Sequence, residues 1–284
     1  MTAAAIDEGK AGTVGELLRE VDRISRIWSP SVDDPEEIWF RGQGRRQDSL
    51  VPALYRADVR RFNYDEDSLF ERFKVFASMY VARNPSSDWE WYFLARHHGL
   101  PSRLLDWSES LLVALYFALL DHVKGLNRLD VDRALGSARP AASYDDGAPA
   151  VWMLDAGTLN KVTCGDDIVM VPGGSRSGRY LPESLKNAAA DNELPIAILP
   201  PRTNARMAAQ QGMFTLHGHR AESLEDIVRS VSSAPIRLAR ISIDRSGICH
   251  LWNELRVLGV TGMGIFPELD SVAAHVAWTC QSLR

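Results

Sequence analysis

The spacing of apolar residues predicts that helices dominate the first half of the chain. Four segments there carry apolar side chains at three- and four-residue intervals, which places those side chains on one face of a helix. Thr13 and Glu16 are spaced as in a capping box, and Ser108 is the expected N-cap of the fourth helix. The predicted helices span residues 14–28, 67–82, 88–97 and 110–124.

The second of these helices carries an apolar stripe that is rich in aromatic residues. Its members recur at helical spacing on one face, and such a stripe is typical of a helix that packs on a hydrophobic core. We therefore predict that the stripe is buried and does not form a cofactor site. It consists of Leu69, Phe70, Phe73, Phe76, Met79 and Tyr80.

Short strands are predicted mainly in the second half of the chain. The run from Glu37 to Gly42 also fits a strand, which enters a glycine-rich turn. Helices first and strands later predict an α+β fold, in which a helical N-terminal half packs on a mostly antiparallel sheet. The later strands are expected at 150–154, 195–199, 212–217 and 236–243, and two helices follow at 246–258 and 268–282.

Length and composition favour one main domain. A chain of 284 residues is near the upper size for a single hydrophobic core, and 45% hydrophobic with 24% charged residues is ordinary for a globular protein. We divide it into an N-terminal helix at 1–29 and a main domain at 30–284. Glycine and charged residues gather near 125–149 and 164–193, which are expected to be mobile, variable insertions.

Charge and cysteine content argue against several classes of protein. The net charge of -5 disfavours a general nucleic-acid or membrane-surface binder. Cys164, Cys249 and Cys280 lie far apart, which disfavours a disulfide framework or a thiolate zinc site. The N-terminus carries charges where a signal peptide needs an apolar run, and the apolar stretch 111–120 is too short to span a bilayer. A cytoplasmic protein without membrane contact is expected.

The first candidate for chemistry is Arg41, at the end of an apolar strand. A guanidinium stays charged and cannot be buried without a partner. Its planar fork suits a carboxylate or a phosphate, and Gly42 and Gly44 leave backbone N–H groups accessible to an anion. The alternative is an internal ion pair. A local basic face near Arg41, or a solvated surface, is formed by Arg45, Arg46, Arg56, Arg60 and Arg61.

The second candidate is the block at 96–108, which reads RHHGLPSRLLDWS and lies between two predicted apolar helices. Polar groups so closely packed must satisfy one another or a ligand. Trp107 is a candidate for stacking on a base or a nicotinamide-like ring. Arg103 and Asp106, three residues apart, are candidates for an ion pair.

The histidines predict no metal site. His97 and His98 are adjacent and cannot point the same way, so at most one is expected to face a pocket. His217 and His219 share one side of a strand end, but no cysteine or H-E-x-x-H helix accompanies them. No metal is expected, and no G-x-S-x-G turn indicates a serine nucleophile.

Two amides and two carboxylates complete the candidates. Gln210 and Gln211 lead into an apolar strand, where a side-chain amide either reaches the pocket edge or satisfies loop backbone. Glu268 and Asp270 lie in the first turn of a predicted helix. The helix dipole favours carboxylates there whether or not they do chemistry.

Taken together, these segments resemble the FRG domain, a bacterial and phage family named for a Phe-Arg-Gly motif, here residues 40–42. The block at 96–108 is similar to the family pattern Q-H-y-G-l-P-T-R-L-L-D-W-T, with Arg96, His98, Ser102 and Ser108 as departures. The resemblance spans about residues 30–280 and by itself implies no particular reaction. Its four segments are IWFRGQG, ARHHGLPSRLLDWSESLLVALYFAL, NARMAAQQGMF and LGVTGMGIFPELDSVAAH.

The order of these motifs also resembles that of ADP-ribosyltransferases. Those enzymes have an Arg at the end of a first strand that binds a phosphate of NAD, then a Ser/Thr segment before a helix, then a strand beginning with a catalytic Glu. Arg41, Ser108 and Gln211 take these places, but a glutamine supplies no negative charge. The resemblance implies catalytic roles for Arg41, Asp106, Gln211 and Glu268, and ligand contacts from Phe40, Gly42, Gln43, His97, His98, Arg103, Trp107, Ser108 and Gln210.

Two classes of function remain open. The first is an ADP-ribosyltransferase-like or NAD-glycohydrolase-like effector in anti-phage defence or a toxin system, with NAD as cofactor and a protein as target. In this class Asp106 or Glu268 replaces the missing carboxylate. The second is a non-catalytic nucleotide-sensing or protein-interaction module. A nuclease is disfavoured, because paired carboxylates at metal spacing are missing and the chain is acidic.

Overall fold

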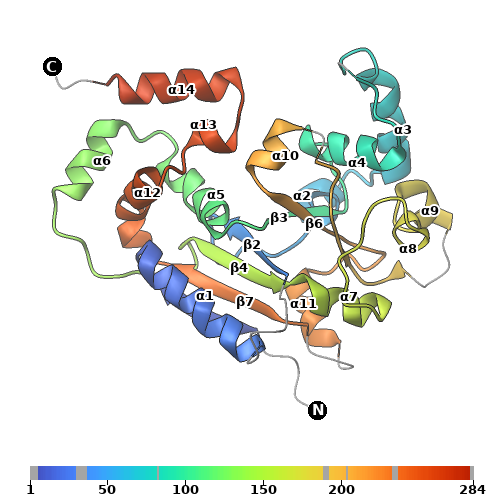
Figure 1. Cartoon of the computed structure of the whole chain (residues 1–284), viewed down its shortest axis with the longest axis horizontal. Helices are drawn as coiled ribbons and strands as arrows, with labels where there is room; N and C mark the ends of the chain where they lie inside the picture. The colour runs from blue at the N-terminus through green and yellow to red at the C-terminus, as the bar shows by residue number, and fades with distance from the viewer. Residues whose placement is uncertain are drawn as a thin grey trace.

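The computed structural model describes residues 6–29, 37–81, 83–187, 192–202, 204–231 and 236–281. At its centre lies a seven-stranded sheet in the order β1-β7-β4-β2-β3-β6-β5 (Figure 1). β1 and β7 run parallel and every other described pair is antiparallel, which confirms the mostly antiparallel sheet. The strands are β1 Asp7–Ala11, β2 Ile38–Gln43, β3 Leu104–Ser108, β4 Ala150–Asp155, β5 Ile196–Ile198, β6 Gly212–Leu216 and β7 Leu238–Ile243.

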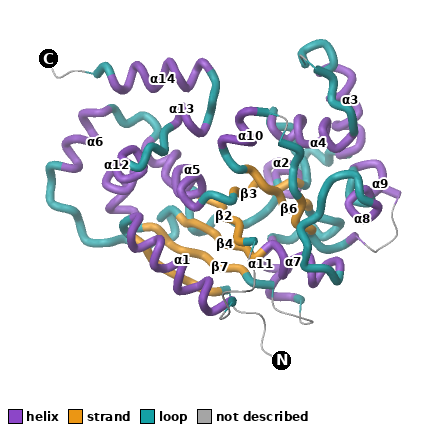
Figure 2. The backbone as a smooth tube through the Cα atoms, viewed as in Figure 1, coloured by secondary structure: helices purple, strands orange, loops and turns teal. Residues whose placement is uncertain are grey.

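Helices surround this sheet. Figure 2 shows α6, α12 and α14 gathered at one end of the molecule and α3, α4, α8 and α9 at the other. No helix in the described ranges is long and apolar enough to cross a membrane. The helices are α1 Val14–Trp28, α2 Ala57–Arg60, α3 Glu66–Ala77, α4 Asp88–His97, α5 Leu111–Val123, α6 Arg128–Leu135, α7 Ala156–Cys164, α8 Ser175–Gly178, α9 Pro182–Asn187, α10 Ala205–Ala209, α11 Leu224–Ser230, α12 Ile248–Val257, α13 Gly262–Ile265 and α14 Leu269–Thr279, with short 3-10 helices at Ala53–Tyr55 and Arg245–Gly247.

The two faces of the sheet carry separate hydrophobic cores. Successive side chains of a strand point to opposite faces, so neighbouring residues on one strand enter different cores. Phe40 packs with α1, α5 and α12 on one face, whereas Trp39 packs on the other with Trp107 and Trp152. A third cluster lies where α3 and α4 meet β6.

Gly42 lets α5 lie directly on β2. A Cβ atom at this position would stand 1.9 Å from the carbonyl oxygen of Ala114 and 2.5 Å from the amide nitrogen of Ala118. Both contacts are to helix backbone, which cannot swing aside as a side chain can. The glycine of the Phe-Arg-Gly motif is therefore required by packing.

Two predictions at helix ends need correction. Thr13 caps α1 as predicted, accepting a hydrogen bond from the amide of Glu16 at 3.1 Å, but the carboxylate of Glu16 accepts from Gly12 instead of Thr13. The N-cap of α5 is Ser110 rather than Ser108. Ser108 instead ends β3, a strand that was not predicted within the block between the two helices.

The prediction that the aromatic stripe is buried holds for its first half and was wrong for its second, and the helix that carries it, α3, ends at Ala77 and not near residue 82. Phe70 is 2% exposed, whereas Phe76, Met79 and Tyr80 are 70%, 79% and 81% exposed. Only the first half of α3 packs on the third core, and its C-terminal end projects from the body of the molecule (Figure 1). Helical spacing identifies an apolar face but does not say whether another element covers it.

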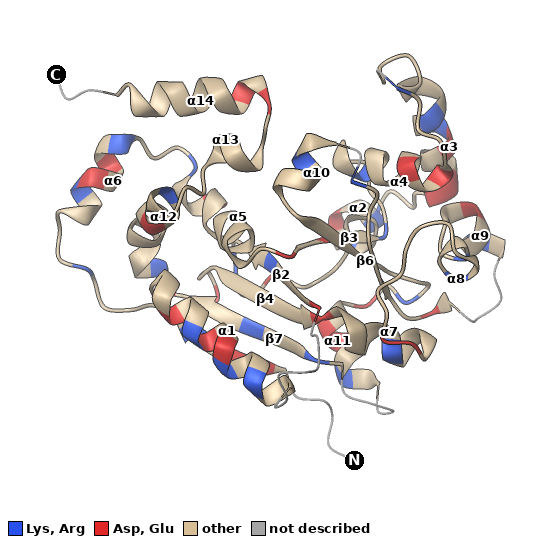
Figure 3. Ribbon diagram, viewed as in Figure 1, with Lys and Arg blue, Asp and Glu red and all other residues tan. Residues whose placement is uncertain are grey.

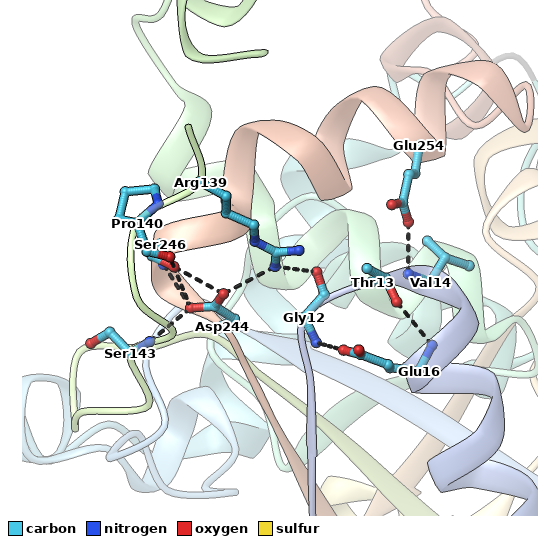
Figure 4. A network of polar contacts seen from close by, with 10 residues as sticks. All are labelled: Gly12, Thr13, Val14, Glu16, Arg139, Pro140, Ser143, Asp244, Ser246 and Glu254. Carbon is cyan, nitrogen blue, oxygen red and sulfur yellow. Dashed lines mark hydrogen bonds and ion pairs between the residues drawn. The ribbon is translucent and has the colours of Figure 1, made fainter. Parts of the chain in front are cut away.

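The segment predicted as an insertion at 125–149 is tied down by a buried carboxylate (Figure 4). Asp244 accepts hydrogen bonds from Ser143 at 2.8 Å and Ser246 at 2.9 Å, and it pairs with Arg139 at 3.0 Å. Burial alone would raise the pKa of Asp244, but these hydrogen bonds hold it below the ordinary value. The network joins this segment to the ends of β1 and β7, because Arg139 also donates to the carbonyl oxygen of Gly12.

The second predicted insertion, 164–193, contains α8 and α9. It returns to the sheet at Met170, which forms a bridge with Ile198 of β5. Residues 188–191 of this segment, like residues 1–5 of the N-terminal segment and residue 282 at the end of the last predicted helix, lie outside the described residues.

Candidate functional site

A cavity of about 820 Å³ lies where β2 and β3 separate. The two strands pair at Phe40 and Ser108. Next to that pair, the guanidinium of Arg41 donates to the main-chain oxygen of Asp106, a group that a fully paired strand would have bonded itself. The ends of α4, α5 and α10 close the cavity, and basic segments of β2, α4 and α10 are visible around this position in Figure 3. Its volume is in the range of ligand pockets.

Asp106 holds two arginines at the cavity wall. Arg96 makes a two-pronged contact with its carboxylate, in which Nε lies 3.3 Å from Oδ1 and Nη2 contacts Oδ2. Nη1 of Arg41 lies 3.8 Å from Oδ2. Burial alone would raise the pKa of Asp106, but Arg96 and Arg41 hold it below the ordinary value. Asp106 is therefore an anion at neutral pH.

Arg41 lies in a strongly cationic environment. Its pKa is lowered to about 10, mainly by burial and also by the charges of Arg96 and Arg56, and Asp106 opposes this shift. Its Nε atom is buried without a hydrogen-bond partner. Arg56 donates to the carbonyl oxygen of Val51 at 3.1 Å, and no carboxylate among the described residues lies within ion-pair distance of it. One carboxylate thus faces three guanidinium groups.

The rim of the cavity carries further charges that are paired. Arg45 lies 3.5 Å from Asp48, and Arg206 lies 3.6 Å from Glu268. The guanidinium of Arg206 also stands over the ring of Phe266, 4.7 Å from its centroid. The charged residues of the wall are Arg41, Arg45, Arg56, Arg96 and Arg206 against Asp48, Asp106 and Asp121, and because Glu268 compensates Arg206 from outside the wall, the excess is one positive charge.

Most of the residues singled out from the sequence meet at this cavity. His97 lines it, whereas His98 lines a separate groove on the outer side of α4. Burial and the charge of Arg206 lower the pKa of His97, so its imidazole is neutral at pH 7. The other predicted residues in the wall are Phe40, Arg41, Gly42, Gln43, Asp106, Trp107, Ser108 and Gln210.

Trp107 contributes to the wall through its strand position, but its indole lies elsewhere. The ring is buried in the core on the opposite face of the sheet, and its Nε1 donates to Thr215 Oγ1 at 3.1 Å. Asp106 and Trp107 are consecutive on β3, so they point to opposite faces. The indole is therefore not positioned to stack on a ligand in the cavity.

Arg103 is also placed away from the cavity. It is buried and pairs with Glu66 of α3, not with its candidate partner Asp106, which pairs with Arg96. It also donates to the carbonyl oxygens of His217 at 2.6 Å and Tyr180 at 2.5 Å. These bonds join β3, β6 and α3, which is a structural role.

Gln211 and Glu268 stand outside the cavity wall. Gln211 is exposed, with a left-handed φ of 46°, and turns the chain into β6. Its neighbour Gln210 faces the cavity instead, and the main-chain oxygen of Gln210 accepts a 2.7 Å hydrogen bond from Ser108. Glu268 is exposed and reaches the site only through Arg206.

The structure places three residues in the cavity wall whose role the sequence did not indicate. Arg56 is one of five arginines near the motif, and only its place in space distinguishes it from Arg60 and Arg61. Arg96 was recognised as a departure from the family pattern, without its partner Asp106. Phe117 brings an aromatic ring to the wall from α5, held edge-to-face at 5.8 Å from Phe266. Within the described part of the chain, no group of three or more His, Cys, Asp or Glu side chains is arranged to hold a metal ion.

Comparison with known proteins gives one match. Residues 36–125 match the model of the FRG domain. This range contains IWFRGQG and the block at 96–108, whereas the two later segments of the resemblance lie beyond it. No curated protein and no solved structure matches the chain.

Proposed function

The chain carries an FRG domain over residues 36–125, and we propose that the cavity beside Arg41 binds a phosphate-bearing nucleotide, with NAD as the first candidate. The observation that carries the proposal is the ratio of three guanidinium groups to one carboxylate at Arg41, Arg56, Arg96 and Asp106.

Uncompensated positive charge in a partly buried cavity is unfavourable unless an anion joins it. The two oxygens of a phosphate match the planar fork of a guanidinium, so a phosphate is the anion that suits this wall. The chain as a whole carries a charge of -5. A small anion held in a cavity therefore fits better than a long polyanion such as a nucleic acid.

NAD is favoured over other nucleotides by where the motifs lie. Phe40, Ser108 and Gly212 form one row across the adjacent strands β2, β3 and β6. The three segments whose order resembles ADP-ribosyltransferases are thus neighbours in space, with Arg41 directly after Phe40 and Gln210 shortly before Gly212. We therefore place the phosphates of NAD at the arginines.

Asp106 is the residue we propose for glycosyl chemistry. Cleavage breaks the bond between C1′ of the ribose and nicotinamide, which leaves with the bonding electrons. Water or an acceptor then forms the new bond to C1′ and releases a proton. Positive charge develops on the ribose meanwhile, and an ionised carboxylate stabilises it.

A second candidate, binding without turnover, is favoured by the pairing of Asp106. Both of its oxygens already contact Arg96, and Arg41 adds a second positive charge. A carboxylate compensated in this way stabilises a cationic transition state less. The same cavity then senses a nucleotide or presents it to a protein partner.

A thermal-shift screen with NAD, ADP-ribose, ATP and nicotinamide tests both readings. At 100 times its Kd a ligand adds about 2.7 kcal/mol, which raises the melting temperature by roughly 5 °C. We expect NAD and ADP-ribose to stabilise the wild type and nicotinamide alone to have no effect. Mass spectrometry of the same samples separates the readings, because release of nicotinamide identifies the enzyme. No shift with any nucleotide would refute the proposed function.

A further inference from the structure

An apolar groove lies on the outer side of α3 and α4, away from the cavity. It has a volume of about 330 Å³. Beside it the chain exposes four large apolar side chains within six residues, Val75, Phe76, Met79 and Tyr80. Contiguous exposure of this kind marks an interaction surface on most proteins. The groove is lined by Phe73, Phe76, Ala77, Tyr80, Val81, Leu94 and His98.

We propose that this surface, the α3–α4 face, is where two copies of the chain associate about a two-fold axis. In such an interface the same face meets itself, so a charged residue near the axis would meet its own copy. The groove lining contains no Lys, Arg, Asp or Glu. Residues 71–90 carry both signs in equal number, Arg72, Lys74 and Arg83 against Glu71, Asp88 and Glu90, and Lys74 pairs with Glu71 at 2.5 Å and with Asp88 at 3.0 Å.

A partner of a different kind is disfavoured by the same observation. Complementary charges commonly select a foreign partner, and they would appear as an excess of one sign around the groove. An anionic membrane would need a basic rim, whereas the three basic residues within 71–90 are matched by three acidic ones, two of which pair with Lys74. A surface that is apolar at its centre and charge-balanced at its edge suits a second copy of itself.

The exposed area is more than half of what a dimer needs. An aromatic side chain buries about 150–250 Å² when covered, so Phe76 and Tyr80 together with the smaller Val75 and Met79 offer roughly 500 Å² on each copy. A standard interface buries about 800 Å² on each partner. The partly exposed groove residues Phe73 and Leu94 supply more of that area.

The face adjoins the candidate site through the last turn of α4. Arg96 and His97 line the cavity, whereas the next residue, His98, lines the groove. Association would therefore hold the end of α4 that carries the arginine paired with Asp106. The dimer itself does not depend on the proposed function.

Sedimentation velocity of the wild type, Phe76→Asp and Val276→Asp between about 1 and about 100 µM tests the proposal. Val276 is the matched control, because it is an apolar residue on another surface helix, α14, and is 52% exposed. We expect the wild type and Val276→Asp to dimerise and Phe76→Asp to stay monomeric. Both substitutions are at exposed positions, so equal melting temperatures at low concentration check that each variant is folded.

Three results would overturn the proposal. A wild type that stays monomeric over the whole range excludes the dimer. A dimeric Phe76→Asp variant places the interface elsewhere. Loss of the dimer in both variants means that α14 of one copy sits in the groove of the next, which is a head-to-tail contact and not a two-fold one.

Discussion

Replacing Glu66 by Gln removes the charge that neutralises the most deeply buried arginine of the site region. The side chain of Arg103 is 2% exposed and that of Glu66 is 10% exposed. Burial alone would lower the pKa of Arg103, but the charge of Glu66 raises it, so the guanidinium stays charged. An unpaired buried charge costs 3–5 kcal/mol in typical cases. The glutamine oxygen still accepts hydrogen bonds, so we expect a loss near the lower end, about 3 kcal/mol.

Glu71→Gln on the same helix is the matched control. Glu71 pairs with Lys74 at the surface and its side chain is 56% exposed, so its loss costs at most about 0.5 kcal/mol. Urea unfolding followed by tryptophan fluorescence gives both free energies of unfolding. Equal losses in the two variants would refute the assignment of Arg103 as a structural residue. If the Glu66→Gln protein were stable but had lost its affinity for the ligand, Arg103 would have to be a binding residue.

Gly42→Ala is expected to lower the free energy of unfolding by about 2–3 kcal/mol, because the new Cβ atom would meet the backbone of α5. A variant with the melting temperature of the wild type would contradict the close approach of α5 to β2. His217 is fully buried and its pKa is lowered to about 3 by burial and Arg103. Below pH 6.5 the imidazole of His217 is protonated in the unfolded state but stays neutral in the folded state. The free energy of unfolding should therefore fall by about 1.4 kcal/mol per pH unit towards pH 3. His217→Phe should remove this slope in urea midpoints, and an unchanged slope would contradict it. Trp107→Phe should lower the free energy of unfolding by about 1 kcal/mol, because the hydrogen bond to Thr215 is lost. The affinity for NAD, measured by calorimetry, should not change. A loss of affinity would mean that the indole reaches the cavity.

The elements with regular apolar spacing were predictable from the sequence. Helix α1 spans the residues that its stripe indicated, and β4 and β7 lie within two residues of their predicted bounds. In α1 burial on one face imposes the helical period, whereas β4 and β7 are buried on both faces and therefore appear as nearly continuous apolar runs. The stripe of α3 had the same period, yet its second half is exposed, since the period does not say what covers a face.

The strand β3 shows why part of the candidate site could not be predicted. Its sequence LLDWS is short, and its neighbours β2 and β6 are far away along the chain. Because β3 was not predicted, Asp106 and Trp107 were both assigned to one pocket, whereas consecutive residues of a strand point to opposite faces of the sheet. The role of Arg56 was equally hidden, because a cluster of arginines looks the same whether it lines a cavity or faces solvent.

Calorimetric titration of NAD into the wild type, Arg56→Ala and Arg60→Ala tests the central claim most directly. Arg56 and Arg60 are both exposed and lie four residues apart, but only Arg56 lines the cavity. Losing a charge-assisted contact with a phosphate costs about 1.5–3 kcal/mol, which is roughly a 10- to 100-fold loss of affinity. We predict this loss for Arg56→Ala and wild-type affinity for Arg60→Ala. Equal affinities in all three proteins, or no binding to the wild type, would contradict the account.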